Sequence, residues 1–173
     1  MVESVSWSDE VFGVFREGEV KQVAYVPDAG HQKLIKLCID YNEIKHVPLT
    51  SEQEGIALLG GAWLGGERGA LLMQSSGVGN VINMLSVPNE CRFPLLMIIT
   101  MRGEWAEFNP WQIPMGQAVE TTLRAMGVVV LRAEEECLIG ETAGSACKLA
   151  FEGGRMVAVL ISQRALGQKN WNK

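Results

Sequence analysis

The sequence has little of what marks several protein classes, beginning with cysteine. It holds four cysteines in 173 residues, and they are widely separated and never form a C-x-x-C pair. That spacing indicates neither a zinc ribbon nor a disulfide scaffold, so we expect reduced thiols that are mostly packed. Basic residues are also few: 15 Lys and Arg stand against 20 Asp and Glu, for a formal net charge of -5. Since nucleic-acid binding is carried by clustered Lys and Arg, no nucleic-acid partner is expected.

Long apolar runs are lacking as well. The longest, such as residues 95–101, are far too short to cross a bilayer, so no membrane association is expected. The amino end, residues 1–10, has no basic region followed by an apolar stretch, so we expect no secretory signal. These features favour a cytoplasmic location.

What the sequence does have is the composition of a globular protein. Hydrophobic residues make up 47% and charged residues 20%, which excludes disorder, collagen and coiled coil. A chain of 173 residues is long enough to bury a core, and it predicts one domain that spans residues 1–173.

Short β-rich runs alternate with helical patterns from one end of the chain to the other. The run 95–100 is uninterrupted and apolar, which is typical of a strand buried on both faces of a parallel sheet. This alternation predicts an α/β fold, a three-layer α/β/α sandwich with a mostly parallel sheet of about six strands. The expected strands are 23–26, 44–49, 69–73, 95–100, 128–131 and 156–161, and the expected helices are 34–39, 50–63, 80–90, 116–126 and 134–151.

In an open parallel sheet, ligands bind in the crevice beyond the carboxyl ends of the strands. The segments expected to line this crevice are 27–31, 50–55, 75–80 and 101–115. The last of these contains a long ordered loop, 103–115, and long loops in compact domains are often functional.

The segment 75–80 reads Ser-Ser-Gly-Val-Gly-Asn and joins a predicted strand to a predicted helix. Backbone N–H groups and the helix dipole favour an anion or the polar edge of a cofactor at such a place. The segment matches neither G-x-G-x-x-G nor the P-loop pattern, so a nucleotide-binding module is not supported. A sterically tight turn explains its glycines equally well.

Acidic residues open the helix expected after residue 50. Ser51 and Glu54 fit a capping box, in which the serine covers an orphan N–H group and the glutamate reaches back. Glu52 falls in the first turn, where the helix dipole favours a carboxylate, and it also faces the predicted crevice. These facts alone leave open whether Glu52 is structural or functional.

Glu52 occurs together with several other features in one register. These are the Gly-aromatic step at 61–66, the strand 70–74, the Ser-Gly-x-Gly-Asn turn within 76–83, and the run 94–99 followed by Arg102 and Gly103. In combination they resemble the pyrimidine-binding domain of thiamine diphosphate enzymes, in particular the alpha subunit of sulfopyruvate decarboxylase and phosphonopyruvate decarboxylase. The resemblance extends from about residue 26 to residue 116 and is looser to the end of the chain.

The resemblance implies that Glu52 is catalytic. In this family a glutamate lies against N1′ of the cofactor's aminopyrimidine, where it shares the proton that activates the cofactor. By position this glutamate is Glu52, and we expect its carboxyl group to be held out of water. The implied reaction is decarboxylation of a small 2-oxo acid to an aldehyde. The other residues expected to bind thiamine diphosphate are Pro27, Ser76, Gly77, Gly79 and Asn80.

The same resemblance suggests residues for the substrate. Arg102 could pair with a carboxylate, sulfonate or phosphonate through its planar guanidinium, and an ion pair at the surface or at an interface explains it equally well. Gln112 could orient the substrate from the following loop. Asp28 and His31 could face the crevice, with a turn and a polar helix start as their structural alternatives. His46 lies within a predicted strand and is expected to be packed.

One motif of the family is missing from the chain. Thiamine diphosphate enzymes hold Mg2+ and the diphosphate with a second domain that carries a Gly-Asp-Gly motif, which does not occur here. The resemblance therefore implies no metal ligands in this chain and a separate diphosphate-binding (beta) subunit that holds Mg2+. It implies a hetero-oligomer with at least two pyrimidine-type subunits, in which this chain alone is inactive.

Two interpretations remain for the aromatic residues of the loop, Trp105, Phe108 and Trp111. They can pack against the partner subunit, since Trp and Phe are favoured at interface cores, or they can line a pocket for a bulkier 2-oxo acid. Packing against the partner is the favoured interpretation. For the chain as a whole, the alternative to a decarboxylase subunit is a non-catalytic cofactor-binding or scaffold protein with the same fold.

Overall fold

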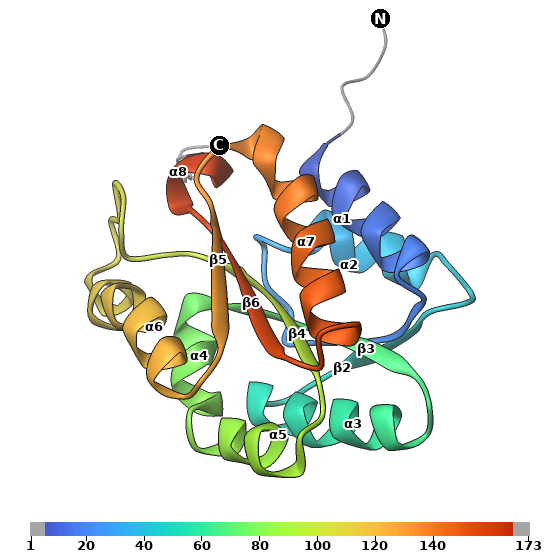
Figure 1. The fold of residues 1–173 in the computed structure, drawn as a ribbon. Helices are drawn as coiled ribbons and strands as arrows, with labels where there is room; N and C mark the ends of the chain where they lie inside the picture. The colour runs from blue at the N-terminus through green and yellow to red at the C-terminus, as the bar shows by residue number, and fades with distance from the viewer. Residues whose placement is uncertain (1–5, 168–173) are drawn as a thin grey trace, which may run out of the picture.

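The computed structural model describes residues 6–167, which form a six-stranded sheet with helices on both faces (Figure 1). Every pair of neighbouring strands is parallel, and the strand order is β2-β1-β3-β4-β6-β5. The predicted fold class is therefore confirmed. The strands are β1 (Val20–Tyr25), β2 (Lys45–Pro48), β3 (Arg68–Gln74), β4 (Leu95–Thr100), β5 (Val129–Ala133) and β6 (Met156–Ile161).

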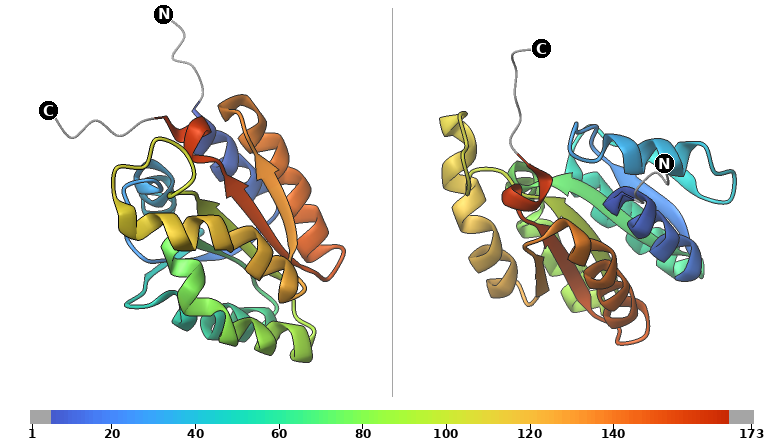
Figure 2. Two further views of the ribbon diagram at one scale, coloured as in Figure 1. Left: turned by 90° about the vertical axis from the view of Figure 1, so that its left-hand side faces the viewer. Right: turned by 90° about the horizontal axis from the view of Figure 1, so that it is seen from above.

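Helices cover the sheet in two layers. The core on one face joins the sheet to α1, α2 and α7, and the core on the other face joins it to α3, α4 and α6, as the two views of Figure 2 also show. Every residue of β4 and of β6 is buried, as expected for central strands. The helices are α1 (Trp7–Glu17), α2 (Gln32–Ile39), α3 (Glu52–Leu64), α4 (Ser75–Val81), α5 (Ser86–Cys91), α6 (Ile113–Ala125), α7 (Ile139–Phe151) and α8 (Gln163–Leu166), with short 3-10 turns at Asn83–Leu85, Pro110–Gln112 and Glu136–Leu138.

The strand order places the crevice. The chain runs from β1 outward to β2, then returns to pair β3 with the other side of β1. The carboxyl ends of β1 and β3 are thus a topological switch point, where open α/β sheets bind ligands. The helices that follow β2 and β3, α3 and α4, start at this edge of the sheet.

Two predicted segments differ from the structure at this edge. Residues 75–80 are not a turn, because α4 begins at Ser75 directly after β3. Glycine disfavours a helix, yet a side chain at Gly77 would collide with Glu52, so tertiary packing overrides propensity. The loop predicted at 103–115 is shorter, because Pro110–Gln112 form a 3-10 turn and α6 starts at Ile113 rather than at Gly116.

Three further predictions, for regions outside the crevice, differ from the structure. The helix α1 was not predicted, although Ser6 caps it and Asp9 accepts hydrogen bonds from the Ser6 backbone N–H and hydroxyl at 3.0 and 2.7 Å. His46 is exposed on β2, an edge strand, instead of packed. All four cysteines are free, but Cys91 and Cys137 are exposed rather than packed. Part of the amino-terminal segment read for a signal, residues 1–5, lies outside the described residues.

No helix within residues 6–167 is both long enough and apolar enough to span a membrane.

Candidate active site

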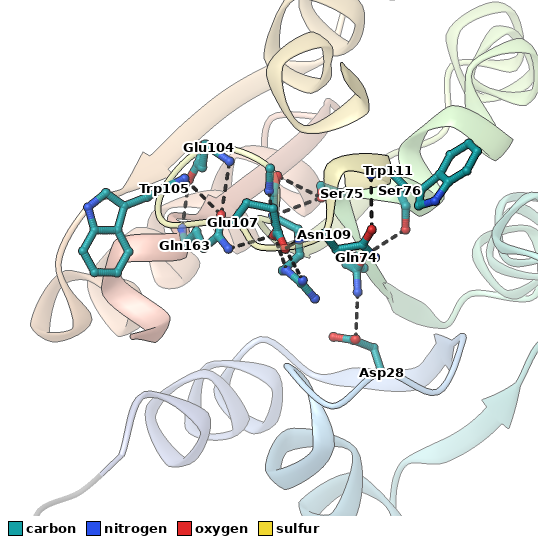
Figure 3. A network of polar contacts seen from close by, with 12 residues as sticks. Asp28, Gln74, Ser75, Ser76, Glu104, Trp105, Glu107, Asn109, Trp111 and Gln163 are labelled. Atoms are coloured by element: carbon teal, nitrogen blue, oxygen red, sulfur yellow. Dashed lines mark hydrogen bonds and ion pairs between the residues drawn. The ribbon is translucent and has the colours of Figure 1, made fainter. Parts of the chain in front are cut away.

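Three strands converge on Asp28 at the crevice. The side-chain amide of Gln74, at the end of β3, donates to Asp28 Oδ1 at 3.0 Å, as Figure 3 shows. Asp28 Oδ2 accepts from the backbone N–H of Gly30 at 2.8 Å and from the hydroxyl of Thr100, at the end of β4, at 3.2 Å. Asp28 therefore closes a turn, as its structural alternative predicted, and also ties β1 to β3 and β4.

Glu52 is a buried carboxyl group at the same edge. It is the first residue of α3, follows the N-cap residue Ser51, and is only 7% exposed. The Asn80 side chain donates a hydrogen bond to Glu52 Oε2 at 2.7 Å. The carboxyl group also packs on Gly77, where an added Cβ would come within 2.6 Å of Glu52 Cδ. This group is held mostly out of water and in one orientation, which suits it to hold and transfer a proton.

The neighbouring Glu54 has a structural role with a different partner from the one predicted. Its carboxylate accepts from the backbone N–H and hydroxyl of Thr50 at 3.1 and 2.6 Å, and Ser51 makes no side-chain cap. These bonds, first the one from the Thr50 hydroxyl, lower the pKa of Glu54 below its ordinary value. The glutamate does reach back across the first turn, but to residue 50 rather than 51.

The predicted cofactor-binding residues lie around Glu52 in two groups. Gly77 is buried beneath the carboxyl group, whereas Ser76, Gly79 and Asn80 are exposed along the start of α4. Ser76 donates to the Gln74 side chain at 2.9 Å, which connects α4 to the hydrogen bonds around Asp28. Pro27 is exposed just past the end of β1. All five therefore lie at the crevice edge of the sheet.

Arg102 forms an ion pair with Glu107, a residue that was not predicted for the site. Its Nε and Nη2 donate to the two carboxylate oxygens of Glu107 at 2.6 and 2.5 Å, and the two side chains are 12% and 3% exposed. Arg102 is thus in an ion pair, but the pair lies within the chain and is nearly buried, whereas the predicted alternative to a substrate contact was a pair at the surface or at an interface. The hydrogen bond from Arg102 is the main reason that the pKa of Glu107 falls to about 2.

A cavity of about 180 Å³ lies over the carboxyl ends of β1, β3 and β4. Asp28 and Arg102, both predicted for the substrate, line this cavity, so the structure brings them together. The cavity is completed by Trp7, Gln74, Thr100, Phe108, Gln163 and neighbouring residues.

The other two predicted substrate residues lie apart from the cavity lining. His31 starts α2 and is fully buried, with Nε2 3.2 Å from the carbonyl oxygen of Met73 and its ring edge-on to Trp7. Burial is the main cause that lowers the pKa of His31 below its ordinary value, so the ring is neutral at pH 7. Gln112 is half-buried at the end of the loop, and its Oε1 finds no hydrogen-bond partner within residues 6–167.

Three polar residues at the crevice were not singled out from the sequence: Gln74, Thr100 and Gln163. Each stands at or just after the end of an apolar strand, which is the signal that could have found them. Gln163 is buried, and its side chain connects the segment after β6 to Glu104, Trp105 and Glu107 (Figure 3). Within residues 6–167, no three His, Cys, Asp or Glu side chains are grouped so that they could hold a metal ion.

Comparison with known proteins adds named relatives. No family model matches the chain. The sulfopyruvate decarboxylase alpha subunit of Methanococcus maripaludis is 38% identical over 122 residues, which are 70% of this chain and 73% of that protein. The alpha subunit of Methanothermobacter thermautotrophicus is 30% identical over 91% of this chain and 96% of its own length. Phosphonopyruvate decarboxylase of Streptomyces hygroscopicus is 36% identical over 104 residues, which span 60% of this chain and only 26% of that protein.

Among solved structures, the fold is similar to that of 2-oxoglutarate:ferredoxin oxidoreductase from Magnetococcus marinus, with a TM-score of 0.71. The match covers 94% of this chain and 29% of the larger one at 15% sequence identity, so it supports the fold alone.

Proposed function

Since the chain belongs to the family of sulfopyruvate decarboxylase alpha subunits, we propose that it is the pyrimidine-binding subunit of a thiamine diphosphate-dependent 2-oxo acid decarboxylase. The observation that carries this proposal is Glu52, a carboxyl group 7% exposed at the crevice and held by Asn80. When bound, thiamine diphosphate supplies the ring that accepts electrons as the acid loses carbon dioxide.

The residues around Glu52 fit the aminopyrimidine end of this cofactor. A buried carboxyl group can share a proton with a ring nitrogen, and Asn80 holds one of its oxygens in place. Gly77 leaves room for the carboxyl group, because any side chain there would displace it. We assign Pro27, Ser76 and Gly79, exposed at the same edge, to contacts with the cofactor.

For the substrate we propose a small 2-oxo acid bound in the cavity that Asp28 and Arg102 line. Glu107 takes the Nε and Nη2 donors of Arg102, so the acid would meet the remaining Nη1 edge of the guanidinium. Gln112 does not line this cavity, and its unpaired Oε1 is an acceptor, so it would not bind the carboxylate of the acid there. His31 is neutral and buried, so it would hold β3 in place through its contact with the Met73 carbonyl oxygen and would not exchange protons with solvent.

The remaining parts of the enzyme would come from a second chain. We propose a diphosphate-binding beta subunit that holds Mg2+, because this chain lacks the Gly-Asp-Gly motif. We further propose that residues 1–173 are one pyrimidine-type domain, present in at least two copies per complex, and that the complex is cytoplasmic. The match to nearly the full length of an alpha subunit supports the single domain.

The test is Glu52→Gln in the reconstituted two-subunit complex. We expect assembly to be unchanged and turnover to fall by about 100-fold to 10,000-fold, because the amide cannot share the proton. The matched control is Glu54→Gln, an exposed glutamate in the same turn of α3, which should keep turnover within about two-fold. Normal turnover by the Glu52→Gln complex would contradict the proposal.

A further inference from the structure

Arg102 and Glu107 form an ion pair, but only Arg102 reaches the cavity over the carboxyl ends of the strands. Arg102 lines this cavity, whereas Glu107 is not among the lining residues and its side chain is only 3% exposed. Glu107 belongs to the loop of residues 103–112, which joins β4 to α6. Since neither a ligand in the cavity nor solvent reaches this carboxylate, Glu107 can act on a ligand only through Arg102.

The Glu107 carboxylate is held in place by donors other than Arg102. Its Oε1 accepts from the backbone N–H of Asn109 at 2.9 Å. Its Oε2 accepts from the backbone N–H of Gly103 at 3.1 Å and from Gln163 Nε2 at 2.9 Å, and Figure 3 shows these bonds around Glu107. The donors come from two separate segments of the chain, so both carboxylate oxygens are fixed independently of Arg102.

This fixed carboxylate in turn fixes the Arg102 guanidinium. Nε and Nη2 of Arg102 donate to the two oxygens of Glu107 at 2.6 and 2.5 Å, and two parallel bonds of this kind set the plane of the guanidinium. The Phe108 ring covers the guanidinium as well, with its centroid 5.6 Å from Arg102 Cζ. Within residues 6–167, Nη1 of Arg102 makes no hydrogen bond, so it is the donor left for a ligand.

Asp28 is a second carboxylate that attracts Arg102, and it lines the same cavity. The hydrogen bond to Glu107 is the main cause that raises the pKa of Arg102 above its ordinary value, and the charges of Glu107 and Asp28 contribute to it. Without Glu107, the guanidinium would be drawn to Asp28, because opposite charges a few ångströms apart attract each other. The paired bonds to Glu107 therefore keep the cation available to a ligand in the cavity.

We propose that Glu107 is a positioning residue, which holds Arg102 so that Nη1 meets an anionic group of the 2-oxo acid. This inference rests on the proposed function, which places the acid in this cavity. The guanidinium is oriented when the chain folds, so less conformational entropy is lost when the acid binds. Glu107 therefore acts on the affinity for the acid, and its loss changes KM more than kcat.

The test is a double-mutant cycle in the reconstituted two-subunit complex, with thiamine diphosphate and Mg2+ present. It compares Glu107→Gln, Arg102→Gln and the double variant, and the melting temperature of each is measured first. The double variant removes both charges and should be more stable than Glu107→Gln, which leaves a nearly buried guanidinium unpaired. Pyruvate, sulfopyruvate and phosphonopyruvate are assayed with the unmodified complex, and the acid with the highest kcat/KM is the probe.

Glu107→Asp is a further variant, which serves if Glu107→Gln does not fold. It keeps the negative charge but draws the carboxylate back by one methylene group, so the two parallel bonds to Arg102 are lost. Its KM should still rise at least about three-fold, because charge alone does not set the plane of the guanidinium.

We expect Glu107→Gln and Arg102→Gln each to raise KM at least about ten-fold and to leave kcat within about three-fold. In the double variant, KM should stay within about two-fold of that of Arg102→Gln, since Glu107 then has nothing to position. Oxamate, an unreactive anion with the shape of pyruvate, gives a readout that does not depend on turnover. Calorimetry should show its Kd raised at least about ten-fold in both single variants.

Glu104→Gln is the matched control. Glu104 belongs to the same loop, is not among the residues that line the cavity, and pairs with Arg132 at 2.7 Å. Its variant should keep KM within about two-fold, because the orientation of Arg102 does not depend on it.

Three results would each overturn the positioning role. These are an unchanged KM in both Glu107→Gln and Glu107→Asp, an effect of Glu107→Gln that is as large in the Arg102→Gln background, and a rise in KM of the same size in Glu104→Gln. Each of them leaves the proposed function standing if the unmodified complex decarboxylates one of the acids. An unmodified complex that turns over none of them contradicts the proposed function, and this role of Glu107 falls with it.

Discussion

Asn80 donates a hydrogen bond of 2.7 Å from Nδ2 to Oε2 of Glu52, and this bond joins the first turn of α3 to α4. The amide is exposed while the carboxyl group is buried, so Asn80 stands at the entrance to the carboxyl group. With Oε2 held by Asn80 and the side chain resting on Gly77, the orientation of Glu52 is fixed before any ligand arrives. Such preorganisation removes the cost of orienting the carboxyl group when a proton is transferred.

We therefore expect Asn80→Asp to reduce turnover of the two-subunit complex by about ten-fold or more, because it replaces a donor with a second carboxyl group beside Glu52. A carboxylate at residue 80 accepts hydrogen bonds and does not donate them, so the bond that holds Glu52 Oε2 is lost. Initial rates of the reconstituted complex check this.

Asn83→Asp is the control for this charge change. Asn83 is exposed one turn beyond Asn80, and no hydrogen bond joins it to Glu52 within the described residues. Its variant should keep the turnover of the unmodified complex. If Asn80→Asp and Asn83→Asp have the same turnover, Asn80 does not act through Glu52.

Gly77→Ala tests the space that the carboxyl group occupies. The added methyl group would overlap the Glu52 side chain, so Glu52 must move and turnover should fall by about ten-fold or more, as a misplaced catalytic group costs. Gly61→Ala is the matched change on α3, because a Cβ there meets nothing within 4 Å. It should keep full turnover and raise the stability by about 0.5–1 kcal/mol through its higher helix propensity. Equal turnover in the two variants would show that Gly77 is not needed.

The sheet was predictable because each strand is a short apolar run followed by a turn or helix signal. Leu95–Thr100 and Met156–Ile161 are uninterrupted, and both are fully buried central strands with the predicted bounds. Helix α1 escaped prediction although Ser6 and Asp9 form a capping signal. Residues 75–80 were misassigned because glycine disfavours helices, and only the close packing of Gly77 on Glu52 explains why a helix forms there.

The site was predictable where a residue type and a strand end coincide. Glu52 and Asp28 were placed at the crevice edge on that basis, and both lie there. Glu107 and Gln163 could not be anticipated in the same way. Their roles depend on how the loop after β4 folds against the segment after β6, which are 56 residues apart in sequence, and no local pattern specifies that contact.

Glu107→Gln should destabilise the isolated chain by about 3 kcal/mol at pH 7, because it removes the charge that neutralises the nearly buried guanidinium of Arg102. The destabilisation should depend on pH. Hydrogen bonds, mainly from Arg102, lower the pKa of Glu107 from 4.5 to about 2. As the pH falls, the Glu107 carboxylate is therefore protonated at a higher pH in the unfolded chain than in the folded chain. The stabilisation by Glu107 is therefore complete above pH 4.5 and is lost as the pH falls toward 2.

Urea unfolding at pH 7, 5, 4 and 3 measures this effect, and the difference between the unmodified chain and Glu107→Gln should narrow at the two lowest values. Glu120→Gln is the control, since Glu120 pairs with Arg124 on the half-exposed surface of α6 at 2.9 Å. Its variant should stay within about 0.5 kcal/mol of the unmodified chain, as exposed pairs on a helix do. A Glu107→Gln chain as stable as the Glu120→Gln chain would show that the loop of residues 103–112 is not held by the ion pair between Arg102 and Glu107.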